Sequence, residues 1–408
     1  MRNYPFVTIT EKGENFLRGG HVWVYADEVV SLHGAPENGN LCDVFSQKSK
    51  YLGTGFYNSS SKIRVRLISR NANDRFDAAF WERKLRWAIE YRKSVMGDKD
   101  FSCCRLIFGE SDAFPGLTID RFGDVLVAEV LSLGMERVKS VVFDILIRIL
   151  RVEYGVEIRV LYERNESPIR NLEGMVCEKG FYRAEGLLTD TDGITEITEN
   201  GIRYEVDYIN GQKTGFFLDQ KYNRRAIRPI AKGKRVLDCF THTGSFALNA
   251  AQAGAERVTA VDVSQNALEI AKRNAEKNGL SDRMEFLCTD VFDYLTAAAD
   301  AGIFPYDFVI LDPPAFTKSR ETLKSAIKGY REINRRAMQL LRRGSYLATC
   351  SCSHFMTDTY FCQTLHNAAE DAGVGLRQIE ARQQAPDHPI LWNVPETDYL
   401  KFYIFQIV

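Results

Sequence analysis

The alternation of hydrophobic and polar residues divides the first half of the chain into two regions. Residues 1–73 contain short apolar and aromatic runs separated by Gly and Asn, namely HVWVYADEV, LCDVFS, YLGTGFY and KIRVRLISR, and this rhythm predicts a small β-barrel. Residues 74–195 begin with the helical pattern FDAAFWERKLRWAIEYRKSVM. They continue through DVLVAEVLSLG, the apolar helix VKSVVFDILIRILRVEYG and the strand IRVLYER, an order that predicts an α+β domain.

In residues 196–408 strand patterns alternate with helical patterns. The short buried strands are RVLDCF, RVTAVDVS, MEFLCTD, YDFVILD and SYLATC, and Ser264 and Thr357 are placed to cap two of the helices. The closing runs LRQIEARQ and YLKFYIFQIV predict an antiparallel pair. Because alternating strands and helices give right-handed crossovers, we expect a parallel sheet covered on both faces, with an antiparallel strand at its edge making seven strands.

The composition indicates the class of protein and the compartment in which it is expected. The 408 residues are 45% apolar and 26% charged, which is typical of a globular protein of two or three domains. The net charge of −1 means that nucleic-acid binding would depend on local patches. No run approaches the length of a membrane span, and the N-terminus lacks a signal peptide. With no secretory signal, the nine cysteines are expected to be reduced thiols in a cytoplasm.

Four consecutive strands of the predicted parallel sheet end in aspartate: Asp238, Asp262, Asp290 and Asp312. A single aspartate at a strand end is a common turn residue. Four of them converge on one crevice, because ligands of such sheets lie beyond the carboxyl ends of the strands. Asp262 can accept hydrogen bonds from ribose hydroxyls, and Asp290 can accept one from an adenine amino group.

The loop after Asp238, CFTHTGSFAL, keeps only Gly244 of the glycine-rich nucleotide fingerprint and has no phosphate-binding lysine. A loop of this kind fits a ligand that has no pyrophosphate. Adenosine without phosphates beside a polar site indicates S-adenosylmethionine.

Residues 196–408 resemble the class I methyltransferases, which have a Rossmann-like domain. The resemblance rests on D-x-F-x-x-x-G-x-F at Asp238, on the ribose aspartate and on D-P-P at Asp312. It implies that Asp238 and Gly244 lie near the methionine part of the cofactor, Asp262 on the ribose and Asp290 on the adenine. The other cofactor residues expected in these loops are Phe240, Thr243 and Val263.

A second stretch, GQKTGFFLDQKYNR at 211–224, resembles the segment that precedes the first strand in this family. The resemblance places four of its residues over the cofactor: Phe216, Asp219, Gln220 and Arg224. The alternative is that the stretch is only a polar hairpin connection.

The run VILDPPAF at 309–316 is the candidate acceptor site. Two prolines, Pro313 and Pro314, stiffen the loop after Asp312 and remove two backbone donors, which suits a planar base with an amino group. Pro-Pro could instead merely end the strand. Amine methylation usually uses an aromatic residue directly after Pro-Pro, whereas Phe316 comes one residue later here. Phe316 is either a stacking partner for the base or a core residue.

The run TCSCSHF places two cysteines at the end of the next strand, whose carboxyl end should neighbour that of Asp312. Carbon 5 of a pyrimidine is too weak a nucleophile to take a methyl group unless a thiolate first adds to carbon 6. Cys352, between serines beyond the strand, is the candidate nucleophile, and Asp312 could supply the acid at ring nitrogen 3. Cys350, inside the apolar strand, is expected to be packing. A zinc pair lacks further ligands, so no metal is expected.

D-P-P-x-F followed by S-C-S, behind G-H-x-W-V-Y at residues 20–25, resembles the ribosomal large-subunit methyltransferase I family. GESDAFPGLTIDRFGD and RNESPIRNLEG extend the resemblance over nearly the whole chain. It implies a PUA-like RNA-binding barrel at 1–73, a central α+β domain at 74–195 and a methyltransferase domain at 196–408. It also implies a homodimer that forms 5-methylcytosine in 23S ribosomal RNA. Many other RNA cytosine methyltransferases carry a second cysteine in the acceptor motif. Here Cys352 alone would both attack and leave.

Basic residues cluster after the D-P-P loop, opposed only by Glu321 and Glu332. They are Lys318, Arg320, Lys324, Lys328, Arg331, Arg335, Arg336, Arg342 and Arg343. This helix could bind phosphates beside the target base, with Lys318 next to it, or could be an ordinary solvated face. In the barrel, alternation puts Lys62, Arg64 and Arg66 on one face, and Arg70 follows. Methylation of a base carbon requires a flipped or single-stranded nucleotide.

Two other functions remain open at this point. The enzyme could methylate an exocyclic amine through Asp312 and Pro313, with Cys352 a bystander. Alternatively, the chain could be an RNA-binding ribosome assembly factor whose methyltransferase fold has lost turnover.

Overall fold

The computed structural model describes residues 4–302, 305–317 and 319–408. The chain forms two compact units that interleave along the sequence. The first unit contains Met1–Ile197, Val206–Leu218 and Pro386–Thr397, and the second contains Thr198–Glu205, Asp219–Ala385 and Asp398–Val408.

The first unit begins with a six-stranded sheet in the order β2-β6-β5-β4-β1-β3. Its elements are β1 (Phe6–Ile9), α1 (Glu11–Arg18), β2 (Trp23–Tyr25), β3 (Val29–His33), β4 (Leu41–Ser46), β5 (Tyr51–Tyr57) and β6 (Ile63–Ser69). β4 and β5 coincide with two of the predicted runs. The runs did not indicate β1, although it pairs with both β3 and β4 and its Val7 and Ile9 are fully buried.

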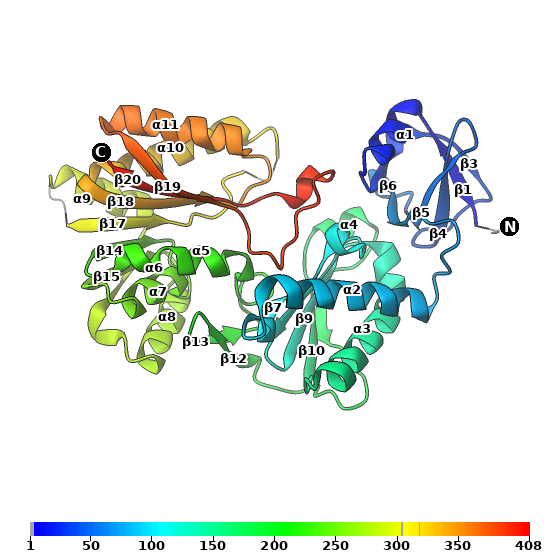
Figure 1. Cartoon of the computed structure of the whole chain (residues 1–408), viewed down its shortest axis with the longest axis horizontal. Coiled ribbons are helices and arrows are strands. Elements are labelled where there is room, and N and C mark those ends of the chain that lie inside the picture. Colours follow the sequence, from blue (N-terminus) through cyan, green and yellow to red (C-terminus); the bar gives the residue numbers. More distant parts are fainter. Residues whose placement is uncertain (1–3, 303–304, 318) are drawn as a thin grey trace. The chain divides into compact units, whose positions relative to one another are not determined.

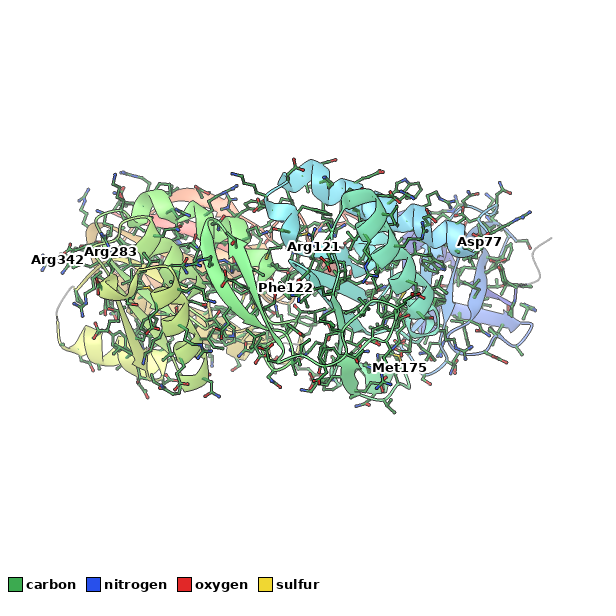
Figure 2. All side chains as sticks on the ribbon, turned by 90° about the horizontal axis from the view of Figure 1, so that it is seen from below. Asp77, Arg121, Phe122, Met175, Arg283 and Arg342 are labelled. Atoms are coloured by element: carbon green, nitrogen blue, oxygen red, sulfur yellow. The ribbon has the colours of Figure 1, made fainter. Side chains whose placement is uncertain are left out.

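The same unit contains a five-stranded sheet in the order β11-β10-β9-β8-β7. Its strands are β7 (Cys103–Phe108), β8 (Leu117–Phe122), β9 (Val125–Val130), β10 (Val160–Asn165) and β11 (Glu178–Phe181), and its helices are α2 (Ala78–Met96), α3 (Leu133–Tyr154) and α4 (Ile169–Leu172). Asp77, labelled in Figure 2, caps α2 by accepting a hydrogen bond from the amide of Phe80. The sequence predicted both α2 and α3, and their apolar faces pack into the hydrophobic core of this region.

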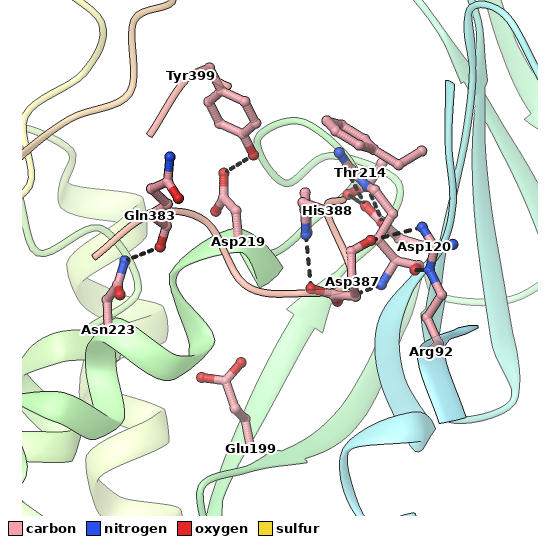
Figure 3. Close-up of polar contacts among 12 residues, drawn as sticks. Arg92, Asp120, Glu199, Thr214, Asp219, Asn223, Gln383, Asp387, His388 and Tyr399 are labelled. Carbon is pink, nitrogen blue, oxygen red and sulfur yellow. Dashed lines mark hydrogen bonds and ion pairs between the residues drawn. The ribbon is translucent and has the colours of Figure 1, made fainter. Parts of the chain in front are cut away.

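Buried ion pairs hold two segments from later in the chain, around Thr214 and Asp387, against this five-stranded sheet (Figure 3). Arg92 in α2 is fully buried and donates to both carboxylate oxygens of Asp112 at 2.6 and 2.7 Å and to the carbonyl of Asp387 at 2.9 Å. Arg105 in β7 binds Asp120 at 2.7 and 2.8 Å, and the hydroxyl of Thr214 donates to the same carboxylate at 2.5 Å. The segments around Thr214 and Asp387 therefore fold with the first unit.

The second unit contains a seven-stranded sheet in the order β16-β15-β14-β17-β18-β20-β19. Its strands are β14 (Arg235–Cys239), β15 (Arg257–Asp262), β16 (Met284–Cys288), β17 (Tyr306–Leu311), β18 (Leu341–Ser351), β19 (Leu376–Arg382) and β20 (Lys401–Ile407). The five strands from β16 to β18 are parallel, as predicted. The antiparallel strand, β20, lies one place in from the edge rather than at it. β20 is buried almost throughout whereas β19 is largely exposed, so the more apolar strand takes the inner position.

Helices cover both faces of this sheet (Figure 1). They are α5 (Lys221–Ala226), α6 (Arg228–Ala231), α7 (Ser245–Gln252), α8 (Gln265–Lys277), α9 (Val291–Asp300), α10 (Leu323–Gln339) and α11 (Asp358–Ala372). α7 packs Phe246 on one face, and α9, α10 and α11 pack Leu295, Ile333 and Ala368 on the other. Both predicted caps are confirmed, because Ser264 accepts from the amide of Ala267 and Thr357 from that of Tyr360.

The strands β12 (Ile194–Glu199) and β13 (Ile202–Asp207) form a separate two-stranded sheet. Among the helices of the described residues, none is long and apolar enough to cross a membrane.

Replacing Arg92 with Met should destabilise the first unit by about 3–5 kcal/mol, because it leaves the carboxylate of Asp112 buried without its cation. Urea unfolding measures the loss. The matched control is Arg148→Met, which removes an arginine whose side chain is half exposed and pairs with Glu82, and it should cost less than about 1 kcal/mol. Equal losses in the two variants would contradict a special role for the buried pair.

Candidate active site at the carboxyl ends of the parallel strands

The strand register brings the predicted carboxylates to one edge of the second unit's sheet. Cys239 of β14 pairs with Val261 of β15 and with Leu311 of β17. Asp238 precedes Cys239, Asp262 is the last residue of β15, and Asp312 directly follows β17. Asp290, two residues beyond β16, is the N-cap of α9. Four adjacent parallel strands thus end at four carboxylates.

Asp238 is the most deeply buried of these carboxylates. Its Oδ2 accepts hydrogen bonds from the Thr241 hydroxyl at 2.5 Å and the Ala247 amide at 2.9 Å. Its Oδ1 is buried and has no hydrogen-bond partner among the described residues, and the same holds for the hydroxyl of Thr243. Burial raises the pKa of Asp238 to about 7. One buried polar atom at the end of β14 and one in the loop after it therefore lack a partner among the described residues, and a polar ligand could supply it.

The loop after β14 has an unusual backbone. Phe240 and His242 adopt φ angles of 60° and 52°, in the left-handed region that non-glycine residues rarely occupy, at a cost of about 1–3 kcal/mol each. The amide of His242 donates to Asp262 Oδ2 at 2.9 Å, which ties the loop to the neighbouring strand. Gly244 has φ 82°, and a Cβ there would lie 3.0 Å from the Cβ of Ala271. Glycine is required at this position for both reasons.

Asp262 and Asp290 are both held by backbone amides. Asp262 accepts from His242 through one oxygen and from Ser264 through the other, at 2.9 Å each, and the following Val263 is 64% exposed. Each oxygen of a carboxylate has two lone pairs, so acceptor positions remain for two vicinal hydroxyls. Asp290 accepts from the first amides of α9 at 2.7 and 3.2 Å and is exposed. Both of these hydrogen bonds go to Oδ1, so capping the helix uses only one of the two carboxylate oxygens of Asp290.

The stretch 211–224 is divided between the two units, and its predicted site residues differ in their contacts. Phe216 is buried and belongs to the first unit. In the second unit, Asp219 accepts from the hydroxyl of Tyr399 at 2.7 Å, as Figure 3 shows, and Gln220 donates to Asp312 Oδ1 at 3.1 Å. Arg224 forms a fully buried bidentate pair with Glu199 at 2.7 and 2.9 Å. The guanidinium of Arg224 is therefore engaged in packing this segment.

Asp312 and Cys350 are in direct contact. The thiol of Cys350 donates to Asp312 Oδ1 at 2.8 Å, and Gln220 Nε2 lies 3.4 Å from the sulfur. Burial, with Asp312 next, raises the pKa of Cys350 well above its ordinary value, so this thiol stays protonated. Burial also raises the pKa of Asp312. Cys350 and Gln220 both donate to Oδ1 of Asp312, so neither of them donates to Oδ2.

The two serines of the S-C-S motif anchor the turn that presents Cys352. Ser351 Oγ donates to the hydroxyl of Tyr330 at 3.0 Å, and Ser353 Oγ donates to the carbonyl of Thr317 at 2.8 Å. Cys352 lies between them, is partly exposed, and has its sulfur 3.8 Å from the carbonyl of Pro313. The cysteine therefore lies against the D-P-P loop, while its serine neighbours are buried.

Sequence reasoning did not identify three polar residues around this cluster. Asn223 donates to Gln220 Oε1 at 2.7 Å and so fixes the amide that binds Asp312. Tyr399 binds Asp219. Lys401 is buried and donates to the carbonyl of Ser353 at 2.8 Å. Only Lys401 had a visible signal, a lysine in the apolar run YLKFYIFQIV.

The residues expected on the substrate side have mixed environments. Pro313 is buried and Pro314 is exposed. Phe316 packs against the rings of Tyr330 and Phe292, with centroids 4.5 and 6.1 Å apart, and it stays partly exposed at the margin of the core. Lys318 lies outside the described residues.

Several of the clustered arginines form ion pairs within the second unit. Arg331 in α10 binds Asp371 in α11, and Arg335 and Arg336 both bind Glu332. Lys324, Lys328, Arg342 and Arg343 are exposed, and Arg342 is labelled on the surface in Figure 2. In the barrel, Arg66 binds Glu110 and Glu173. Fewer basic side chains are therefore available to bind RNA phosphates than the number of Lys and Arg residues in the sequence indicates.

In the part of the chain that the structure describes, no group of three or more His, Cys, Asp or Glu side chains is placed to hold a metal ion.

Comparison with known proteins shows that two parts of the chain match described families. Residues 182–405 match the S-adenosylmethionine-dependent methyltransferases, and residues 7–70 match the PUA-like domain. A Pseudoalteromonas translucida protein named Ribosomal RNA large subunit methyltransferase I is 39% identical and covers 96% of both chains. The protein of that name from Klebsiella pneumoniae is 36% identical over 99% of both chains. A solved structure described as a SAM-dependent methyltransferase from Streptococcus mutans has a TM-score of 0.81 at 22% identity, covers 98% of this chain and 99% of its own, and shows the same fold.

The chain is therefore an S-adenosylmethionine-dependent methyltransferase with a Rossmann-like domain and a PUA-like domain at its N-terminal end. Within that class it belongs to the family of Ribosomal RNA large subunit methyltransferase I. Its cofactor is S-adenosylmethionine. The residues fit this cofactor, because the buried oxygens of Asp238 and Thr243 that have no partner in the described part of the chain suit its charged amino-acid end.

Asp238→Asn should remove a pH dependence of stability in the cofactor-free protein. With a pKa of about 7 when folded and 3.8 when unfolded, Asp238 retains its proton in the native state only, so wild-type stability falls as the pH rises from about 4 to above 7. Between pH 5 and pH 8 the variant should gain roughly 2 kcal/mol relative to wild type.

Urea unfolding at the two pH values measures this gain, and calorimetry should show that the variant binds S-adenosylmethionine more weakly. Asp290→Asn is the matched control, because Asp290 is exposed, and it should show no such relative gain. An Asp238→Asn variant whose stability follows wild type at both pH values would contradict the raised pKa of Asp238.

Proposed function

We propose that the protein methylates carbon 5 of a cytosine in 23S ribosomal RNA through a covalent adduct between Cys352 and carbon 6 of the base. The observation that carries the proposal is the contrast between the two cysteines. Cys350 is buried, protonated and bonded to Asp312, whereas Cys352 is partly exposed beside Pro313. A nucleophile must reach its substrate as a thiolate, and of these two cysteines Cys352 is the one with that access.

The proposed reaction assigns each group one task. The Cys352 thiolate forms a bond to carbon 6, and Asp312, whose pKa burial raises, donates a proton to ring nitrogen 3. The cofactor supplies the methyl group from its sulfonium. Carbon 5 would take this methyl and leave S-adenosylhomocysteine. A base would then remove the proton from carbon 5, the carbon–sulfur bond would break to release the thiolate, and ring nitrogen 3 would return its proton to Asp312. Gln220 and Asn223 orient Asp312 throughout.

The cofactor would be held by the loops at the strand ends. Asp238, Thr243 and Gly244 would hold its methionine part, Asp262 and Val263 its ribose, and Asp290 its adenine. Phe240 gives the first loop its shape, and Asp219 and Gln220 belong to the segment that would close over the cofactor. Pro313 and Pro314 would line the base site, with Lys318 contacting RNA.

The RNA substrate follows from the relatives, whose name specifies ribosomal RNA of the large subunit. The PUA-like domain and the exposed lysines of α10 are the surfaces expected to contact it. The family resemblance further predicts a homodimer in the cytoplasm, and light scattering of the purified protein tests the dimer.

Cys352→Ala should lower methylation of large-subunit RNA by at least about a thousandfold, because it removes the nucleophile. Cys350→Ser is the matched control and should keep activity within about fivefold, since a serine hydroxyl can donate the same hydrogen bond to Asp312. Transfer of radioactive methyl from S-adenosylmethionine measures both. Substantial activity in Cys352→Ala would favour methylation of an exocyclic amine instead.

RNA that contains 5-fluorocytosine tests the adduct itself. Fluorine cannot leave carbon 5 as a proton does, so the wild-type protein should remain bonded to the RNA on a denaturing gel, and Cys352→Ala should not. Mass mapping of ribosomal RNA from cells that lack the protein should show one missing methyl on a cytosine. A missing methyl on adenine or guanine would overturn the proposal.

A further inference from the structure

Lys401 lies at the start of β20, opposite Ser351 in the antiparallel ladder with β18. Only 5% of its surface is exposed. Its Nζ donates to the carbonyl of Ser353 at 2.8 Å and to that of Tyr399 at 3.2 Å. One end of the Cys352 turn is therefore tied to a buried amino group, in addition to the serine contacts described above.

No carboxylate oxygen of a described residue forms an ion pair with this amino group. The two nearby carboxylates have other partners: Asp358 accepts from the hydroxyl of Tyr403 at 2.5 Å, and Asp398 accepts from Gln383 at 3.1 Å. A buried ammonium is costly unless negative charge balances it. Burial accordingly lowers the pKa of Lys401 to about 8, while Asp398, Asp358 and Cys352 act in the opposite direction.

We propose that Lys401 is a positioning residue that holds its ammonium beside Cys352 and so increases the fraction of this cysteine present as thiolate. The proposal rests on the proposed function for its role in catalysis, but not for the electrostatic effect itself. It adds to that function the group that prepares the nucleophile.

The physical basis is the reciprocity of charge interactions. If a thiolate at Cys352 favours the charged form of Lys401, the ammonium favours the thiolate by the same free energy. The charged and titratable groups that act on Lys401 are Asp358 of α11, Asp398 of the preceding loop and Cys352, and Asp358 in turn accepts from Tyr403 of the same strand as Lys401. Because Lys401 loses its proton around pH 8, its support of the thiolate is full near neutral pH and declines at higher pH.

Alkylation of Cys352 by iodoacetamide in the absence of RNA tests the proposal, because iodoacetamide reacts with the thiolate. Tandem mass spectrometry distinguishes Cys352 from Cys350. At pH 7, Lys401→Met should slow the alkylation about tenfold, and Lys401→Arg, which keeps the charge, should stay within about threefold of wild type. The exposed Cys177 and Cys288 of the same protein are internal controls and should react equally in all variants.

A pH series from 6 to 9 separates charge from shape. The wild-type advantage over Lys401→Met should shrink above pH 8, which a merely structural role would not produce. Lys401→Gln, which can still donate to the Ser353 carbonyl, provides a second neutral variant if Met disturbs folding, and it should react as slowly as Met. Alkylation of Cys352 that matches wild type in a folded neutral variant, or an equal loss in Lys401→Arg, would overturn the proposal.

Failure here is distinguishable from failure of the proposed function. If Lys401→Met slows alkylation while Cys352→Ala still methylates RNA, the ammonium acts on the thiol but the thiol is not the nucleophile. If alkylation is unchanged while 5-fluorocytosine traps Cys352, the cytosine mechanism stands without Lys401.

Discussion

The pairing of β17 with β18 is the constraint on which the catalytic end of this protein depends. Leu311 lies opposite Thr349 in that parallel ladder, so the residues that follow each strand emerge side by side. The hydrogen bond from Cys350 to Asp312 closes the pair of strands at that end. A shift of one residue in the register would turn Cys350 to the other face of the sheet and separate the two groups.

Chemical asymmetry between two nearly adjacent cysteines follows from this arrangement. Cys350 is enclosed by the sheet and keeps its proton, and so it serves as a hydrogen-bond donor. Cys352 begins the turn beyond the strand, where Ser351 and Ser353 take the structural contacts and leave the thiol at the surface of the D-P-P loop. The S-C-S motif therefore combines two anchors with one accessible sulfur.

The cofactor end uses stored strain and burial in place of a glycine-rich loop. Left-handed Phe240 and His242 shape the turn after β14, and Asp238 is kept buried with one oxygen that has no hydrogen-bond partner among the described residues. Both features cost stability in the absence of ligand, which is typical of binding sites.

The chain also leaves the second unit twice, at 206–218 and 386–397, and buried arginine–aspartate pairs hold those segments in the first unit.

The sequence by itself determined the parallel sheet, the strand-end aspartates, the cofactor and the family, because strand periodicity and short motifs are local properties. It also separated Cys350 from Cys352, since one lies inside an apolar run and the other beyond it. Only the tertiary structure decided that β20 lies between β18 and the edge strand β19, that Arg224 forms a buried ion pair with Glu199 and that Phe316 packs against Tyr330. Lys401 became visible beside the cysteine turn for the same reason: these contacts join residues far apart in the chain, and no local pattern records which partners packing will bring together.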